Sequence, residues 1–303
     1  MKGGVQRPEL PNDIKMATKL SHPNVGSHIA KPPEPRPLAL NCVSVVSLES
    51  VRMSRLRSAL VFFLFVWLLP AGAVTAEIRV AVAANFASTL KVLAKGFRSE
   101  TGHRVQISPG STGKHYAQIR NGAGFDIFLA ADSARPERLE AEGVGVVGSR
   151  FTYAVGRLAL WVPRETGLGP ADEYLRSAGF RRLAIANPRL APYGLAAQQV
   201  LEAWQLWGPL QARLVKGENA AQAYQFVATG NAPAGLVALS QLRAGGAPAG
   251  TYRLIPEGLH QPIRQQALLL RPGAAAEAFL RYLGGRAATA VIRAAGYQVP
   301  DGR

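Results

Sequence analysis

The segment FTYAVGRLALWVP, residues 151–163, is long, apolar and rich in aromatic and β-branched residues. This composition is typical of a buried β-strand. The segment is longer than an average strand. Its length predicts a strand that leaves one domain and enters another, so we expect the chain to form two domains joined through it.

Strand and helix patterns alternate on both sides of this segment. Strands are predicted at 77–84, 105–108, 125–130, 183–186, near Leu214 and at 235–238, and a return segment at 252–270. Helices are predicted after residue 84, from the end of the loop 109–113 to about residue 121, from residue 136, at 193–204 and 219–229, and at 274–283 and 287–295. Strands that alternate with helices of this length indicate βαβ units and parallel sheets, so the fold class is α/β.

The first 76 residues differ from the rest of the chain. Residues 1–52 are rich in proline and polar residues, which is typical of a disordered or wrongly assigned extension. Residues 53–76 contain a start methionine, two arginines, an apolar block at 59–73 and the small residues Val74-Thr-Ala76. This arrangement predicts a secretory signal peptide cleaved after about Ala76. The alternative is a signal anchor, although the apolar block is shorter than the roughly 20 residues that cross a bilayer.

Charge and cysteine content exclude several classes of protein. The 303 residues carry a formal charge of +16, which suggests a nucleic-acid binder. However, the arginines of residues 77–303 are dispersed and form no basic run or ladder with aromatic residues. We therefore interpret them as a basic solvated surface and expect no nucleic-acid partner. Cys42 is the single cysteine, which excludes a disulfide framework and a zinc site built from several thiolates.

Four predicted junctions between a strand and the following helix carry small, hydroxyl or amide residues. They are Ala84-Asn85, Ser111-Thr112, Pro192-Tyr193-Gly194 and Asn219-Ala220. Helix capping explains any one of them taken alone. Together, four helix starts at the carboxyl ends of strands favour an anion site formed by free amide groups and helix dipoles. Because Lys114 and Glu218 are the charged residues here and acceptors are few, the expected anion is fully ionised.

Other motifs do not support catalysis. The loop PGSTGK at 109–114 lacks the first glycine of a phosphate-binding loop, and His115 replaces the hydroxyl residue that follows the lysine. His103, His115 and His260 have no zinc-hydrolase spacing and are expected to be surface or hydrogen-bonded residues. Asp126 and Asp132 lie about 20 Å apart along an extended strand. We interpret them as capping or hinge residues, and we predict no enzyme.

Several longer runs resemble the periplasmic molybdate-binding proteins of ABC importers. The runs are VAVAANF at 80–86, SPGSTGKHYAQIRNGA at 108–123, FDIFLAAD at 125–132, GSRFTYAVG at 148–156, ANPRLAPYGL at 186–195, GLVAL at 235–239 and AAGY at 294–297. They occur in order and cover essentially all of residues 77–300. The resemblance implies a two-lobed periplasmic binding protein fold of type II, with mixed, mainly parallel sheets and a hinge cleft. It implies one lobe from 77–155 and 255–303 and a second from 156–254.

The resemblance also implies a set of ligand-binding residues: Ala84, Asn85, Ser111, Thr112, Tyr193 and Ala220. In this family such positions bind molybdate through its oxygens, Asn85 and Thr112 by side chain and backbone amide, Tyr193 and Ala220 by backbone amides. Three positions depart from the family pattern. Ala84 replaces a hydroxyl residue, Ala220 replaces a valine, and Ala238 stands where another branch has a ligand tyrosine.

The sequence therefore predicts a periplasmic protein that binds molybdate or tungstate and delivers it to a membrane permease, without a cofactor. Neutral donors suit a fully ionised oxyanion and reject protonated phosphate, whose hydrogen would face another donor. Sulfate has the same charge and a smaller size, so a receptor for another oxyanion such as sulfate remains the alternative.

Overall fold

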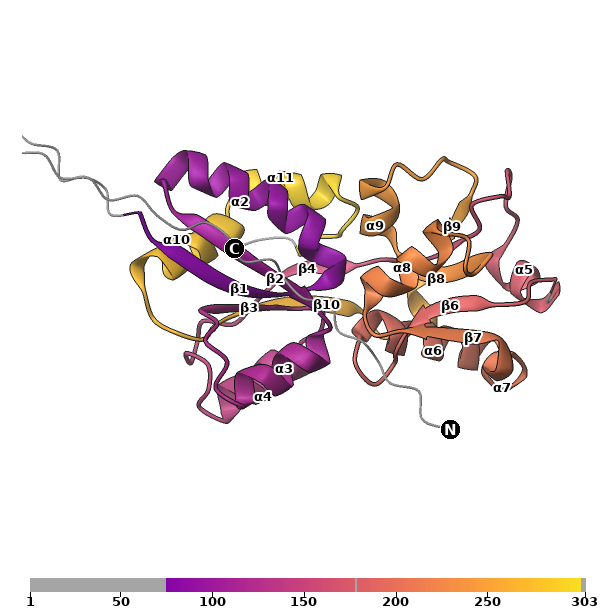
Figure 1. Ribbon diagram of the computed structural model, residues 1–303, viewed down its shortest axis with the longest axis horizontal. Coiled ribbons are helices and arrows are strands. Elements are labelled where there is room, and N and C mark those ends of the chain that lie inside the picture. The colour runs from indigo at the N-terminus through magenta and orange to yellow at the C-terminus, as the bar shows by residue number, and fades with distance from the viewer. Residues whose placement is uncertain (1–74, 178, 301–303) are drawn as a thin grey trace, which may run out of the picture. The chain divides into compact units, whose positions relative to one another are not determined.

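The computed structural model describes residues 75–177 and 179–300, which form two five-stranded sheets with helices on their faces (Figure 1). The predicted N-terminal extension and nearly all of the predicted signal peptide lie outside the described residues. Among the described helices, none is long and apolar enough to cross a membrane.

The first sheet has the strand order β2-β1-β3-β10-β4. Its strands are β1 (Glu77–Ala83), β2 (Arg104–Gly110), β3 (Ile127–Ala130), β4 (Phe151–Gly156) and β10 (Ile263–Leu269). Strands β2, β1 and β3 pair in parallel, and β10 runs antiparallel to both β3 and β4. Four strands therefore point the same way and one points the other way, so the sheet is mixed and mainly parallel, as predicted.

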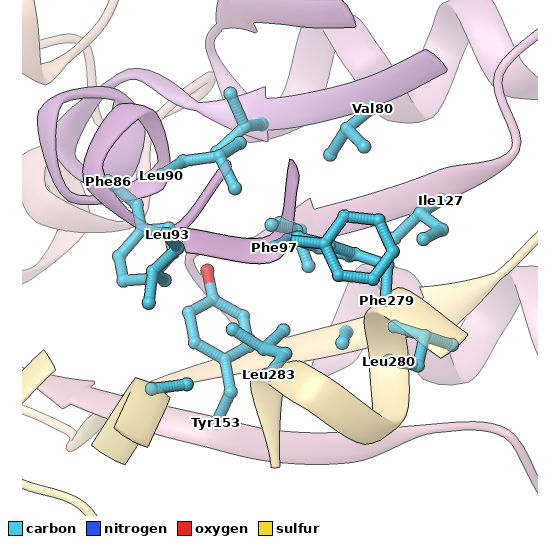
Figure 2. Close-up of a cluster of buried hydrophobic side chains, with 14 of the residues drawn as sticks. Val80, Phe86, Leu90, Leu93, Phe97, Ile127, Tyr153, Phe279, Leu280 and Leu283 are labelled. Atoms are coloured by element: carbon cyan, nitrogen blue, oxygen red, sulfur yellow. The ribbon is translucent and has the colours of Figure 1, made fainter. Parts of the chain in front are cut away.

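Two helical layers cover this sheet (Figure 1). One contains α2 (Ala87–Thr101), α10 (Ala274–Leu283) and α11 (Arg286–Ala294), and the other contains α3 (Thr112–Arg120) and α4 (Ala134–Ala141). Figure 2 shows the core of the first layer, where Leu90, Leu93 and Phe97 of α2 pack with Phe279 of α10. Gly102 caps the C-terminal end of helix α2, and its φ of 76° is the left-handed conformation that glycine adopts most readily.

The second sheet repeats the pattern with the order β7-β6-β8-β5-β9. Its strands are β5 (Leu158–Trp161), β6 (Leu183–Ala186), β7 (Leu214–Gly217), β8 (Ala234–Ala238) and β9 (Tyr252–Leu254). Its helices are α5 (Ala171–Ser177), α6 (Pro192–Ala203), α7 (Trp207–Leu210), α8 (Ala220–Ala228) and α9 (Leu239–Ala244). Short 3-10 turns are η1 (Ala84–Phe86), η2 (Gln211–Arg213) and η3 (Glu257–Leu259). Here too four strands share one direction and β5 opposes them.

The segment at 151–163 does pass from one sheet to the other, but as two strands rather than one. Strand β4 ends at Gly156 and β5 begins at Leu158, with Arg157 between them. The Arg157 carbonyl accepts a hydrogen bond from Leu239 N, and its guanidinium lies 3.0 Å from a carboxylate oxygen of Glu257. The chain returns between β9 and β10, so two segments connect the sheets.

Candidate functional site

The four predicted junctions all lie at the starts of helices that follow β-strands. Ala84 and Asn85 form η1 directly after β1, and Thr112 begins α3 after β2. In the second sheet, Tyr193 is the second residue of α6 and Ala220 is the first residue of α8. These residues and Ser111 are almost completely buried. The first-turn amide groups of a helix have no acceptor within the helix, so each start offers hydrogen-bond donors.

Capping explains part of this pattern. The Ser111 Oγ accepts a hydrogen bond from Lys114 N at 3.3 Å, and the Asn219 side chain accepts one from Gln222 N at 3.0 Å. Thr112 Oγ1 accepts from Ala131 N at 3.1 Å, which leaves its hydroxyl hydrogen free to donate elsewhere. Each cap satisfies one amide of its helix, so other first-turn amides remain as donors.

Contacts between the two sheets bring these junctions together. Gly113 N donates to Leu190 O at 2.9 Å and thereby joins the start of α3 to the loop before α6. Lys114 and Glu218 form an ion pair of 2.7 Å, which joins the start of α3 to the loop before α8. Turn η1 in turn contacts helices α8 and α9. The starts of α3, α6 and α8 and the turn η1 are therefore linked by contacts from both sheets.

The electrostatics of the junctions favour an anion that carries no proton. Lys114 and Glu218 neutralise each other and are about half exposed. The helix starts themselves supply partial positive charge. Among the described residues, no group of three His, Cys, Asp or Glu side chains is placed to hold a metal ion. The arrangement can bind an oxyanion through neutral N–H and O–H donors.

The side chain of Asn85 has a different role from the expected one. Its Nδ2 atom donates to Gln265 Oε1 at 3.0 Å and to Tyr297 Oη at 3.1 Å, which uses both amide hydrogens. The backbone carbonyl oxygen of Asn85 accepts from Ser240 Oγ at 3.2 Å and from Tyr297 Oη at 2.8 Å. The side chain therefore fixes the η1 turn, and the backbone N–H of Asn85 is the donor left for a ligand.

Comparison with known proteins identifies the family. The model of the bacterial extracellular solute-binding protein family matches residues 78–298. The chain belongs to this family. One curated relative is the molybdate-binding protein ModA of Azotobacter vinelandii. It is 49% identical to this chain over 249 residues, which are 81% of this chain and 99% of the relative. The molybdate-binding protein ModA of Rhodobacter capsulatus is 42% identical over 76% of this chain and 90% of the relative.

A solved structure agrees with the sequence relatives. The periplasmic molybdate-binding protein of Azotobacter vinelandii superposes with a TM-score of 0.71 at 42% identity, over 74% of this chain and all of that chain. The predicted resemblance to periplasmic molybdate-binding proteins and the two-lobed fold class are thus confirmed. The relatives are solute-binding proteins rather than enzymes, in agreement with the prediction that this solute-binding protein performs no catalysis.

Four polar residues near the predicted site of this solute-binding protein were not expected to contribute to it. Tyr153, Ser240, Gln265 and Tyr297 are buried and contact Asn85 or one another. No local pattern marks them, because each lies in a strand, a helix or a terminal segment far from the junctions along the chain. Two of the four belong to quoted family runs, Tyr153 to GSRFTYAVG at 148–156 and Tyr297 to AAGY at 294–297.

Three other sequence features have structural roles in this solute-binding protein. Asp126 accepts a hydrogen bond from Arg79 N at 2.7 Å, and Asp132 accepts one from Arg135 N at the start of α4 at 3.1 Å. These contacts confirm a capping role for Asp132. His115 is buried and hydrogen-bonded, as the second of the two predicted alternatives has it, because its Nδ1 lies 3.1 Å from Gln118 Oε1. Its Nε2 atom has no hydrogen-bond partner.

Proposed function

We propose that this protein binds molybdate, and also tungstate, and delivers it to the membrane permease of an ABC importer. The observation that carries the proposal is the meeting of four helix starts from two sheets around neutral donors. The 49% identity to a molybdate-binding protein over 99% of its length supports the same ligand. Molybdate and tungstate are fully ionised at neutral pH, so each of their oxygens accepts hydrogen bonds.

We assign the anion to Ala84, Asn85, Ser111, Thr112, Tyr193 and Ala220. Ala84, Asn85, Tyr193 and Ala220 contribute backbone N–H groups, and Ser111 and Thr112 add their hydroxyls. Because Asn85 Nδ2 is already engaged, this assignment uses its backbone amide only. Alanine at 84 supplies no hydroxyl, so the site has one side-chain donor fewer than the family pattern.

We further propose that residues 77–155 and 255–303 act as one lobe and 156–254 as the other, and that the lobes close on the anion. Closure places donors from both lobes around one oxyanion and creates the conformation that a permease can distinguish. The protein acts in the periplasm after cleavage at about Ala76. Intact-mass measurement of the exported protein tests this, and a first residue other than Glu77 would move the cleavage site.

Thermal unfolding of the purified protein with molybdate, tungstate, sulfate or phosphate tests the proposed ligand. At about 100 times its dissociation constant a specific ligand adds roughly 2.7 kcal/mol to the free energy of unfolding. For a chain of this size we expect molybdate and tungstate to raise Tm by about 5 to 10 °C. Phosphate should give no shift, because its hydrogen would meet a donor.

The outcome separates the candidate functions. A shift with sulfate that equals the shift with molybdate would favour a general receptor for dianionic tetrahedral oxyanions. No shift with any of the four anions would refute the proposal.

A further inference from the structure

Gln265 lies at the centre of a fully buried polar cluster that joins the two sheets. It is a residue of β10 with no measurable exposure, and its neighbours Ile263 and Ala267 are buried as well. The polar cluster consists of Asn85, Tyr153, Tyr193, Ser240, Gln265 and Tyr297. A polar side chain in this position must satisfy its hydrogen bonds internally, because water does not reach it.

The carboxamide of Gln265 uses both of its ends. Its Oε1 accepts from Asn85 Nδ2 at 3.0 Å and from the Tyr153 hydroxyl at 3.2 Å. Its Nε2 donates to the Tyr193 hydroxyl at 3.4 Å. Asn85 belongs to η1 beside the first sheet, and Tyr193 belongs to the first turn of α6 beside the second. The side chain of Gln265 therefore forms hydrogen bonds with both η1 and α6.

The surroundings hold the carboxamide in one place. A methyl group at Gly156 would overlap the Tyr193 hydroxyl and would lie 3.0 Å from Gln265 Nε2. The absence of a side chain at Gly156 thus allows the Tyr193 ring and the Gln265 amide to meet at the end of β4. The residues that hydrogen-bond to the amide, Asn85, Tyr153 and Tyr193, are uncharged.

We propose that Gln265 is a positioning residue that sets η1 and the first turn of α6 at the spacing that a dianionic oxyanion requires. The proposal rests on the function proposed above and extends it to a residue that does not touch the anion. The neutrality of the side chain is part of its role, since it provides one donor and one acceptor without placing negative charge behind the site.

The substitution Gln265→Glu tests this role because it keeps the size of the side chain. When its carboxyl is protonated, glutamic acid can still donate to Tyr193 and accept from Asn85. When ionised, it only accepts, and its charge opposes a dianion. Burial raises the pKa of a carboxyl. The tyrosines around it remain neutral, since burial raises the pKa of Tyr153 and Tyr193 well above the ordinary value of 10.0, and also raises that of Tyr297.

Isothermal titration with sodium molybdate between pH 6 and pH 9 gives the readout. We expect the affinity of the Gln265→Glu protein to fall by about tenfold or more as the pH rises, while that of the unchanged protein stays nearly constant. Gln265→Leu should weaken binding at every pH to a similar degree. A residue with a merely structural role would not give the glutamate protein a pH profile of its own.

Gln266→Glu is the matched control. The adjacent Gln266 is also nearly buried, but its Oε1 accepts from Arg150 Nη1 at 3.0 Å and its Nε2 donates to Thr152 Oγ1 at 3.1 Å. A glutamate there pairs with Arg150 and faces no ligand-binding element. We expect its molybdate affinity and pH profile to match those of the unchanged protein.

Two results separate the possible failures. If the unchanged protein does not bind molybdate, the proposed function fails. If it binds and Gln265→Glu binds within about twofold of it with the same pH profile, the role of Gln265 is refuted. Should the Gln265 proteins not fold, Tyr193→Phe removes the hydroxyl that accepts from Gln265, and unchanged molybdate affinity in that folded protein would equally overturn the proposal.

Discussion

At the scale of single residues, the buried ring of His115 couples stability to pH. It packs edge-on against Phe125 and Phe128, and its Nδ1 lies 3.1 Å from Gln118 Oε1. Burial lowers its pKa from the ordinary value of 6.5. In the unfolded chain the ring takes up a proton near pH 6.5, whereas the folded protein resists protonation. The free energy of unfolding therefore keeps its full value above about pH 6.5 and decreases as the pH falls below it.

Thermal unfolding between pH 5 and pH 8 measures this loss of stability at low pH. We expect Tm to decrease below pH 6.5 and His115→Gln to lose part of that dependence, because glutamine has no proton to gain. The control His260→Gln, at a partly exposed position between η3 and β10, should keep the wild-type profile. Parallel profiles for His115→Gln and the unchanged protein would contradict the assignment.

Asn85 shows the limit of local sequence patterns, because its side chain contacts distant residues instead of remaining free to donate as predicted. The sequence places it in the site because it follows a strand and begins a helical pattern. Its side chain contacts Gln265 and Tyr297, which lie 180 and 212 residues away along the chain. No local pattern reports contacts over such separations. Helix starts were predictable because capping chemistry is local, whereas the polar cluster depends on how both sheets assemble.

We expect Asn85→Ala to weaken molybdate binding and also to destabilise the free protein. The substitution leaves Gln265 Oε1 and Tyr297 Oη without one partner, at a cost of about 1 to 3 kcal/mol in the free energy of unfolding. Urea unfolding without ligand measures this cost, and titration with molybdate measures the loss of affinity. Asn121→Ala, at the exposed end of α3, is the control and should change neither quantity. A full loss of affinity with unchanged stability would instead indicate direct contact between the amide and the anion.

At the scale of elements, the strands and the longer helices follow from periodicity. The predicted strand at 183–186 and helix at 274–283 agree with β6 and α10 residue for residue. The break at Arg157 was not predictable, because residues 151–163 are apolar on both sides of it and only the pairing of each half with a different sheet separates them. Helices α5 and α9 were missed because they are short and begin directly beside loops or strands.

Gly194 tests how tightly α6 is placed on its sheet. A methyl group here would overlap the carbonyl oxygen of Ala186 at the end of β6 and lie 2.7 Å from the carbonyl carbon of Asn187. Backbone atoms cannot move aside as a flexible side chain does, so Gly194→Ala should lower the free energy of unfolding by about 2 kcal/mol or more. Chemical denaturation measures this change.

The comparison variant for this prediction is Gly208→Ala in α7. A methyl group there meets nothing within 4 Å, and alanine favours helix, so stability should stay the same or rise slightly. Because Tyr193 precedes Gly194 in the first turn of α6, we also expect the Gly194→Ala protein to bind molybdate more weakly. Equal stability of the two variants would show that α6 can shift away from β6.

At the scale of the whole molecule, the two sheets share one topology. In each, the fourth strand in the order runs opposite to the other four, and that strand is β10 in the first sheet and β5 in the second. Both opposing strands adjoin the segments that connect the sheets. The residues proposed for the site therefore come from equivalent places in two similar units, which explains why one kind of junction recurs in the sequence.

The net charge of the molecule affects how an anion approaches it. Residues 77–303 contain 26 lysines and arginines against 15 acidic residues, so the protein that carries the site is strongly basic. The charged pair at the junctions is neutral in sum, and the remaining donors are uncharged. For the proposed site we therefore expect the basic surface to attract a dianion at long range, and short-range hydrogen bonds, which salt screens little, to retain it.

This division predicts different salt dependences for the two rate constants of molybdate binding. Between 20 and 200 mM salt the association rate constant should fall by roughly threefold to tenfold, because screening weakens the attraction between a basic surface and a dianion. The dissociation rate constant should stay nearly constant, since breaking neutral hydrogen bonds in a buried site involves little screening. Stopped-flow measurement with a non-binding salt resolves both constants. A dissociation rate that rises with salt as steeply as association falls would place a charged side chain against the anion and contradict a site of neutral donors.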